Sequence, residues 1–293
     1  MNVNVNVKAN PNPNPNPNLN TNPEARTRKP ERTALITGSS SGIGEAFADV
    51  FAAEGFALAL VARREDRLNA VAERLRKQYG VRVDVFAQDL STRDASARLC
   101  AALEARGITV DALVNNAGYG VPGSYTASPW QHHDDFLQVL VVAVAELTYR
   151  LLPGMIERGY GRIINVASLA GLVPAPAGHT LYGAAKAFLI KFSEALANEV
   201  RGHNVHVTAL CPGFTLSEFH DVTGTRQKMK EMPRWVWMDA PTVARQGFDA
   251  VMAGQSIYIN GRLNRTIAAL VRHLPQRLVY SMGRRAGRRY RKV

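Results

Sequence analysis

Short apolar runs rich in β-branched residues alternate with helix-length stretches from residue 33 onward, and this alternation limits the fold more than any other feature of the chain. Strands separated by helices predict parallel crossovers, and continuously apolar strands are typical of a sheet covered on both faces. We therefore predict an α/β fold with a doubly wound parallel sheet of about seven strands and helices on both faces. The predicted strands are 33–37, 56–61, 81–87, 110–114, 162–166, 205–210 and 255–259, and the clearest helices are 42–53, 65–79, 130–158 and 182–201.

The two ends of the chain differ from this alternating body. Residues 1–32 contain an Asn-Pro repeat, in which each proline removes a backbone donor and biases its predecessor toward extended geometry. A helix cannot form there, and we predict a disordered tail. Residues 33–261 form the predicted single domain, because no linker rich in Pro, Gly or Ser divides them. Residues 262–293 form a C-terminal extension.

Composition indicates a soluble globular protein. Hydrophobic residues make up 46% and charged residues 20% of the chain, which are ordinary values for such proteins. No apolar run approaches the ~18 residues that a membrane-spanning helix needs. The two cysteines, Cys100 and Cys211, are too few for a disulfide framework and lack the spacing of a metal site. We therefore expect a cytoplasmic protein without a bound metal.

The formal net charge of +12 is concentrated in the C-terminal extension. Residues 262–293 contain ten Lys or Arg and no acidic residue, which leaves 26 basic and 24 acidic residues before them. Apolar clusters at 267–271 and 278–280 alternate with these arginines, a composition that suits an interfacial helix on anionic lipid. Nucleic acid is a weaker option, because aromatic residues for stacking are few there. The alternative is a solvated tail that packs its apolar face onto the body.

A glycine-rich turn joins the first predicted strand to the first predicted helix. Glycines at positions 38, 42 and 44 permit a tight turn and a close approach of the backbone to a ligand. A pyrophosphate can then lie on the N-terminal amides of the helix. Such turns also exist only to reverse the chain, but the position in the first strand-helix unit favours a ligand.

Further motifs follow the predicted strands in order, and with the glycine turn they make the chain resemble the short-chain dehydrogenase/reductase family. Asn115-Asn116-Ala117-Gly118 follows the fourth strand, Ser168 the fifth and Pro212-Gly213 the sixth, and Tyr182 and Lys186 open the next helix. The resemblance covers about residues 33 to 260. It implies an NAD(P)-dependent oxidoreductase with a Rossmann-type fold, in which hydride passes between the nicotinamide and a carbonyl or alcohol carbon.

Three residues are the predicted catalytic set: Ser168, Tyr182 and Lys186. Tyr182 and Lys186 lie four residues apart and share one helix face, so the ammonium is expected to lower the phenol pKa from ~10 toward the working pH. Tyr182 would then act as acid or base, and Ser168 would hold the substrate oxygen. In isolation the Tyr-Lys pair could be a surface pair and the serine could end a strand. Their joint placement after neighbouring strands favours catalysis.

Arginines after the second strand favour NADP(H), with NAD(H) as the second option. Arg63 is the main candidate for the 2′-phosphate, since an NAD enzyme usually carries an acidic residue there. Solvated surface charge is the alternative, and is favoured for Arg64. Ser41 stands where many NADP-preferring relatives carry Lys or Arg. Asp89 resembles the residue that accepts from the adenine amino group, although it could simply form a turn. The resemblance implies these cofactor-binding residues: Gly38, Ser40, Ser41, Gly42, Ile43, Gly44, Arg63, Arg64, Asp89, Leu90, Asn116, Ala117, Gly118, Tyr182, Lys186, Pro212, Gly213 and Ser217.

One position departs from the family pattern. A helix Asn usually lies thirteen residues before the proline that is Pro153 here, and that position holds Leu140. In the family this Asn helps to hold water on the catalytic lysine. An apolar side chain at that place is expected to interrupt the proton relay, and it is the one feature that favours a non-catalytic dinucleotide-binding sensor or scaffold of the same fold.

The substrate is predicted to be a small hydrophobic carbonyl or alcohol compound. Many apolar residues fall in the expected lid and in the segment after Ser168, although they could equally pack the lid onto the domain or a second subunit. They are Phe214, Phe219, Met229, Met232, Trp235, Trp237, Leu172, Val173, Pro174 and Pro176. His179 and His206 are expected in packing or on the surface. The apolar stretch 136–152 resembles the helix through which relatives associate, so we expect a homodimer or homotetramer.

Overall fold

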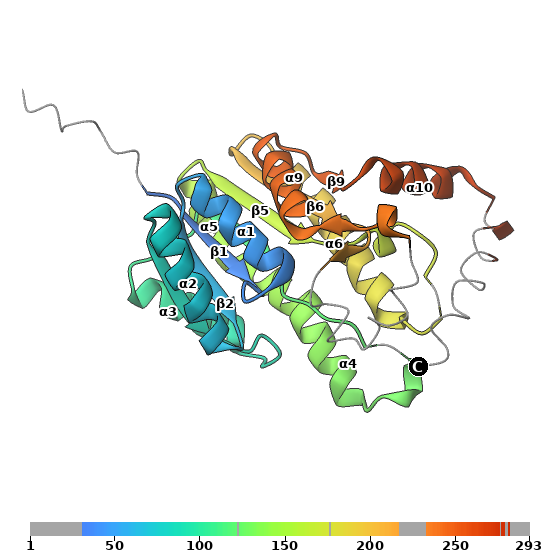
Figure 1. The fold of residues 1–293 in the computed structure, drawn as a ribbon, viewed down its shortest axis with the longest axis horizontal. Coiled ribbons are helices and arrows are strands. Elements are labelled where there is room, and N and C mark those ends of the chain that lie inside the picture. The colour runs from blue at the N-terminus through green and yellow to red at the C-terminus, as the bar shows by residue number, and fades with distance from the viewer. Residues whose placement is uncertain are drawn as a thin grey trace, which may run out of the picture. The chain divides into compact units, whose positions relative to one another are not determined.

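A parallel sheet forms the centre of the domain. The computed structural model describes residues 31–121, 123–175, 177–216, 233–275, 277, 278 and 281. Within these residues seven strands pair in the order β3-β2-β1-β4-β5-β6-β9 (Figure 1). Every neighbouring pair is parallel, so the predicted doubly wound Rossmann-type sheet is confirmed. The strands are β1 Thr33–Thr37, β2 Ala57–Ala62, β3 Val83–Ala87, β4 Ala112–Asn115, β5 Gly161–Val166, β6 Val205–Cys211 and β9 Ile257–Ile259.

Helices cover both faces of the sheet, because alternate strand residues point to opposite faces and both sets are apolar. On one face Ile36, Leu60 and Leu210 pack with α1, α2 and α9. On the other face Leu35 and Leu113 pack with α3, α5 and α6. The helices are α1 Gly42–Ala53, α2 Glu65–Tyr79, α3 Ala95–Ala105, α4 Trp130–Leu137, α5 Ala143–Glu157, α6 Thr180–Glu199, α9 Ala240–Met252 and α10 Arg262–His273.

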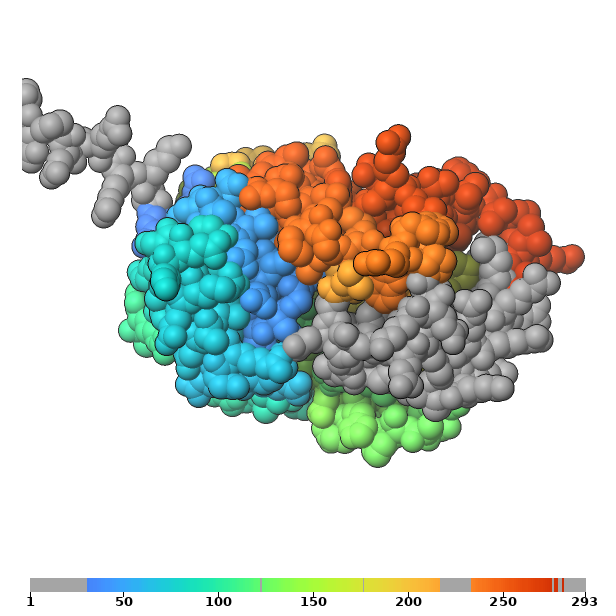
Figure 2. Space-filling view, in the orientation of Figure 1, coloured from blue at the N-terminus to red at the C-terminus, as the bar shows by residue number. Residues whose placement is uncertain are grey.

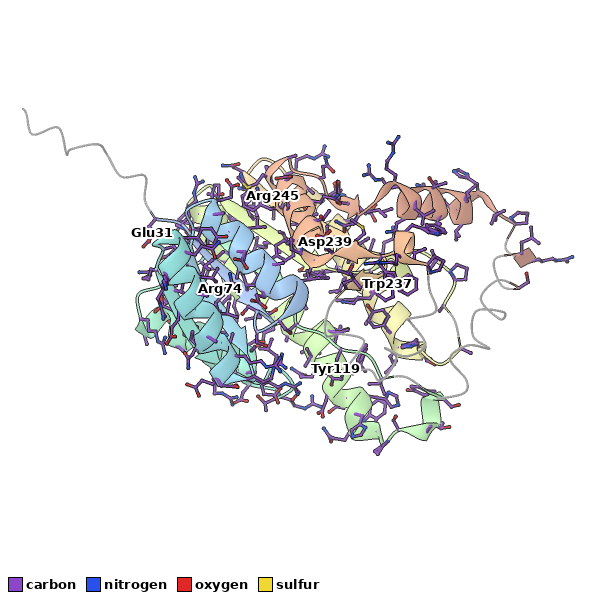
Figure 3. The ribbon with its side chains drawn as sticks, viewed as in Figure 1. Glu31, Arg74, Tyr119, Trp237, Asp239 and Arg245 are labelled. Carbon is purple, nitrogen blue, oxygen red and sulfur yellow. The ribbon has the colours of Figure 1, made fainter. Side chains whose placement is uncertain are left out.

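Polar contacts fix two of these helices. Arg74 of α2 reaches α1, where it lies 3.0 Å from Glu45 and 2.6 Å from Asp49 (Figure 3). Asp239 caps α9 by accepting a hydrogen bond from the Thr242 amide at 2.7 Å, and this bond lowers the pKa of the Asp239 carboxyl. The cap sets where α9 begins, just after the segment that borders the site.

The predicted long helix 130–158 is interrupted. Residues Gln138–Val142 form a π-helical turn between α4 and α5, and the combined helix Trp130–Glu157 is long and apolar enough to cross a membrane by length and composition alone. Leu147 and Met155 nevertheless pack in the core beneath the sheet. This helix therefore belongs to the folded domain.

The remaining differences from the sequence prediction lie at element ends. Strand β2 starts and finishes one residue later than predicted, and β9 is shorter than 255–259. The prediction did not specify α3 or α9, nor the two-stranded pairing of β7 Thr215–Leu216 with β8 Met238–Asp239. The predicted disordered tail falls outside the described residues except for its last two positions. Ser217, Phe219, Met229, Met232 and Pro176 also lie outside them.

Candidate active site

The carboxyl ends of the strands open into one cavity of about 840 Å³, which we call the main cavity. It reaches from the glycine turn after β1 to the residues after β5 and β6. The structure brings most of the predicted site residues to its wall, namely Gly38, Ser40, Ser41, Gly42, Ile43, Arg63, Arg64, Asp89, Leu90, Asn116, Ala117, Gly118, Ser168, Tyr182, Lys186, Pro212 and Gly213. Gly44 is buried behind that wall.

Glycine is required at three points of the turn after β1. Gly38 and Gly42 have φ of 68° and 61°, in the left-handed region that glycine favours. A Cβ at position 44 would lie 2.2 Å from the Gly38 carbonyl oxygen. The turn therefore packs tightly on the start of α1 and leaves its open side to the main cavity. A cradle of this kind, at the N-terminus of a twelve-residue helix, fits a dinucleotide pyrophosphate.

The loop after β4 holds the glycine turn in place. The Thr37 hydroxyl accepts hydrogen bonds from the amides of Asn116 and Ala117, each at 3.0 Å. The Asn116 side-chain amide donates to the carbonyls of Thr37 at 3.0 Å and Gly38 at 3.2 Å. The side-chain nitrogen of Asn116 is therefore committed to the turn, and its position beside the cavity follows from that role.

The end of β2 places a guanidinium over the glycine turn. Arg64 donates to the hydroxyls of Ser40 and Ser41, both at 3.2 Å. The sequence interpretation favours solvated charge for Arg64; the side chain is exposed, and the structure adds that it reaches back across the turn. Many NADP-preferring relatives carry Lys or Arg at the position of Ser41. Here Arg64, which follows the neighbouring strand β2, places a cation beside that position.

Arg63 faces a different set of side chains. Burial raises the pKa of Tyr119 to about 12, with the negative charges of Asp135 and Asp89 acting in the same direction and the positive charge of Arg63 against it. Tyr119 lies on the loop beside α4 (Figure 3), and its ring packs edge-to-face on that of Phe136, with ring centres 5.8 Å apart. Asp89 also accepts a hydrogen bond from the Ser91 amide at 3.0 Å, so it forms a turn as well as lining the cavity.

Ser168, Tyr182 and Lys186 meet at the other end of the main cavity. Ser168 follows β5, and its hydroxyl accepts a hydrogen bond from the Ala170 amide at 3.1 Å. Burial raises the pKa of Tyr182 to about 12, and a hydrogen bond with Ser168 acts in the opposite direction. The expected lowering of the phenol pKa by Lys186 is not what the structure shows, because the cost of burying a phenolate dominates.

Lys186 lies beside the Tyr182 ring but bonds to the backbone. Its ammonium lies 5.7 Å from the centre of the Tyr182 ring and donates to the Val166 carbonyl at 2.7 Å. Burial lowers the pKa of Lys186 to about 8, with the neighbouring Cys211 acting in the opposite direction. The lysine can therefore exchange its proton near neutral pH, while the phenol keeps its own.

Leu140 packs away from the open part of the site. It lies in the π-helical turn, is 1% exposed and belongs to an apolar cluster with Ala185. A Cβ on Gly118 would meet the Leu140 side chain at 3.5 Å, whereas Val139 is the residue of this turn that lines the cavity. An apolar contact thus occupies the family's Asn position, and the interrupted relay stays a prediction.

The wall beyond the catalytic set is mainly apolar. Val173 and Pro174 line it as expected, whereas Leu172 packs against the core instead. Trp237 packs against Phe214 in a tilted arrangement, with ring centres 5.5 Å apart, on the segment that leads to α9 (Figure 3). The other described wall residues of this region are Phe214, Thr215, Trp235, Val236, His179, Leu263, Asn264 and Ile267.

Two features of this wall were missed from the sequence. His179 lines the cavity, and burial lowers the pKa of its imidazole, although packing or surface was expected. His206 does pack, against the Val251 carbonyl at 2.9 Å. Three residues of α10 also line the cavity, which agrees with the alternative that the extension packs its apolar face onto the body, although the sequence analysis did not place them at the site. The i, i+4 spacing of Leu263 and Ile267 was the available signal.

Metal chemistry has no visible support in this part of the chain. Among the described residues, no group of three or more His, Cys, Asp or Glu side chains could hold a metal ion. Cys100 and Cys211 are free thiols.

Comparisons with known proteins agree with this architecture. A family model for short chain dehydrogenase matches residues 32–228. Nodulation protein G of Rhizobium sp. (strain N33) is 37% identical over 241 residues, which cover 79% of this chain and 96% of that protein. Very-long-chain 3-oxoacyl-CoA reductase of Laccaria bicolor is 37% identical over 191 residues, covering 64% of this chain but only 56% of that reductase.

Solved structures give the same result. A short-chain dehydrogenase from Sphingobium yanoikuyae in complex with NADPH superposes with a TM-score of 0.73 and 28% identity, covering 84% of this chain and 96% of that one. A 7β-hydroxysteroid dehydrogenase superposes with a TM-score of 0.76 and 27% identity, covering 86% and 96%.

Proposed function

Because the chain belongs to the short-chain dehydrogenase/reductase family, we propose that it is an NADP(H)-dependent enzyme that interconverts a hydrophobic carbonyl compound and its alcohol. One observation carries this proposal. Ser168, Tyr182 and Lys186 share the wall of one cavity with the glycine turn, so a dinucleotide lying on the turn extends toward them. The intact set argues against the non-catalytic sensor or scaffold.

The nicotinamide cofactor supplies or accepts the hydride when it is bound. Tyr182 donates its phenolic proton to the carbonyl oxygen during reduction and takes it back during oxidation. Its raised pKa of about 12 keeps that proton in place at neutral pH until negative charge develops on the substrate oxygen. The Ser168 hydroxyl orients the same oxygen. Lys186, with a pKa lowered to about 8, returns a proton to the phenol.

The rim of the glycine turn supports a preference for NADP(H). The Arg64 guanidinium is held by two serine hydroxyls at the point where β2 ends, and Arg63 lies next to it on the cavity wall. Paired guanidinium and hydroxyl donors suit a phosphate monoester better than a ribose hydroxyl. The NADPH complex of the Sphingobium yanoikuyae dehydrogenase is consistent with this choice.

Apolar residues at the far end of the cavity support a hydrophobic substrate. Phe214, Val236 and Ile267 come from three different segments and converge there. The relatives include proteins named for very-long-chain 3-oxoacyl-CoA and for hydroxysteroid substrates, whose acyl chain and steroid skeleton are apolar. A carbonyl carried on an apolar skeleton is therefore the substrate class that we propose.

The proposal includes a homodimer or homotetramer in the cytoplasm. Trp130, Val142, Tyr149 and Phe188 are large apolar residues that lie exposed on the α4–α5 helix and on α6. The rings of Phe188 and Phe192 stack with centres 5.7 Å apart. Such a face suits association with a second copy, and two free thiols suit a reducing compartment.

The experiment is an assay of NADPH oxidation against a panel of apolar ketones. Tyr182→Phe keeps the ring but removes the proton, so kcat/KM should fall at least about 100-fold while NADPH binding is retained. Tyr79→Phe, at the end of α2 and outside the cavity wall, is the matched control and should leave the rate unchanged. A Tyr182→Phe enzyme with near-normal turnover would show that another group supplies the proton.

A further inference from the structure

Helix α10 has one apolar edge that the domain does not cover. Its larger apolar residues recur at 263, 267, 270 and 271, so a 3.6-residue period places them on one side of the helix. Leu263 is 40% exposed and Leu270 is 59% exposed. Figures 1 and 2 show α10, in red, at the periphery of the described body beside the orange segment that precedes α9.

One flank of α10, next to this apolar edge, is fixed to the domain. Asn264 is buried and donates to the Asn260 carbonyl at 2.7 Å. A Cβ on Gly213 would lie 2.5 Å from the Asn264 amide nitrogen, so the helix touches the turn after β6. This anchor holds α10 against the turn, while Leu263 and Leu270 keep exposed surface.

The exposed edge adjoins the substrate end of the main cavity. Leu263 and Ile267 line that cavity together with Trp235, which is 72% exposed. One apolar stripe therefore runs from the interior of the site to the molecular surface. A ligand dissolved in an apolar phase could enter along it without crossing water.

Positive charge surrounds this stripe. Residues 262–293 contain ten Lys or Arg and no acidic residue. Within the described residues Arg262, Arg265, Arg272 and Arg277 are exposed. An exposed apolar edge with a basic flank is the pattern of a helix that lies in the plane of an anionic lipid surface.

We propose that α10 and the basic extension bind the surface of an anionic lipid bilayer and place the mouth of the main cavity against it. Charge complementarity favours lipid over a second copy of this chain, whose extension would carry the same charge. The exposed leucines favour lipid over nucleic acid, which would leave them unpaired. If the proposed function holds, the apolar substrate reaches the site from the bilayer; the docking itself does not depend on that function.

The test uses the full-length protein and cosedimentation with vesicles of phosphatidylcholine alone or mixed with phosphatidylglycerol, without substrate. We expect binding only to the anionic vesicles, weakened by ~0.5 M salt. Leu270→Asp should reduce binding at least tenfold, whereas Leu270→Met should retain it. Arg272→Glu should weaken binding by about fivefold per charge changed. Arg201→Glu is the matched control, because Arg201 follows α6 at the amino edge of the sheet, opposite the cavity.

Orientation is tested by quenching of tryptophan fluorescence with brominated lipid. Trp235 should account for most of the quenching, so Trp235→Phe should remove most of it. Unchanged quenching in that variant overturns the proposed orientation. Three results would overturn the docking. The protein could bind neutral vesicles equally well, the substitutions of Leu270 and Arg272 could leave vesicle binding unchanged, or the protein could bind RNA but not vesicles. Thermal unfolding of each variant, followed by circular dichroism, shows that the fold is intact and keeps this result separate from the enzymatic proposal.

Discussion

Replacing Arg64 with alanine tests the proposed preference of the cavity for NADPH over NADH. The Arg64 guanidinium is held 3.2 Å from the hydroxyls of Ser40 and Ser41, so it is preorganised at the rim of the glycine turn. The substitution removes this cation and leaves the turn itself intact, since Asn116 and Thr37 hold the turn independently.

The magnitude follows from the exposure of the arginine. A hydrogen bond to a charged group contributes about 1.5–3 kcal/mol, and solvent screening at an exposed side chain places Arg64 at the lower end. About 1.4 kcal/mol corresponds to tenfold in affinity, so the Kd for NADPH should rise about tenfold. The Kd for NADH should change less than about twofold, because a neutral ribose hydroxyl gains little from a guanidinium.

The assay is titration of both dinucleotides by fluorescence, at low and high salt. Arg63→Ala and the double variant show whether the two arginines share the phosphate, and their effects need not add because they are neighbours. Lys77→Ala is the control, since Lys77 is an exposed cation in the last turn of the same helix and does not line the cavity. Equal losses for NADPH and NADH in all three arginine variants would refute phosphate recognition by this rim.

Three further predictions concern burial. Lys186→Met should abolish turnover yet raise the Tm at pH 7. Burial lowers the Lys186 pKa from 10.5 to about 8, so the buried ammonium destabilises the folded state by about 3 kcal/mol, before the hydrogen bond to Val166 is counted. The folded state binds this proton more weakly than the unfolded state, so the wild type should gain stability from pH 8 to 10.5 and the difference in Tm should vanish by pH 10.5; a constant difference would contradict the cause. Gly44→Ala should abolish cofactor binding, because its Cβ would lie 2.2 Å from the Gly38 oxygen. In the control Gly154→Ala the new Cβ meets only the movable Arg158 side chain, so this variant should be tolerated. Calorimetry of both variants with and without NADPH measures the difference. Leu140→Asn should lower the unfolding free energy by about 3 kcal/mol in denaturant titration, because apolar burial is lost and an amide is left unpaired. The control Leu140→Met should lower it by less than about 1.5 kcal/mol. A stable Leu140→Asn protein that turns over faster would support the interrupted relay.

Residues near one another in the sequence were sufficient to predict the architecture. Alternating periodicities set the order of strands and helices, and buried parallel strands leave few ways to connect them. The positions of Gly38, Asn116, Ser168, Tyr182 and Pro212 also follow from that order. Each lies after a parallel strand or at the start of the helix beyond it, and the carboxyl ends of such strands share one edge of the sheet.

Only the tertiary structure decided the properties that depend on distant neighbours. Arg64 contacts hydroxyls 23 and 24 residues earlier, and no local pattern predicts that contact. The phenol pKa of Tyr182 rises because the folded chain buries it, whereas helical spacing to Lys186 alone predicts the opposite direction. Similarly, α10 becomes part of the cavity wall because Asn264 packs on the turn at Gly213, about fifty residues away in the chain. Local periodicity determines which elements form, but burial and charge at a site come from groups that only folding brings together.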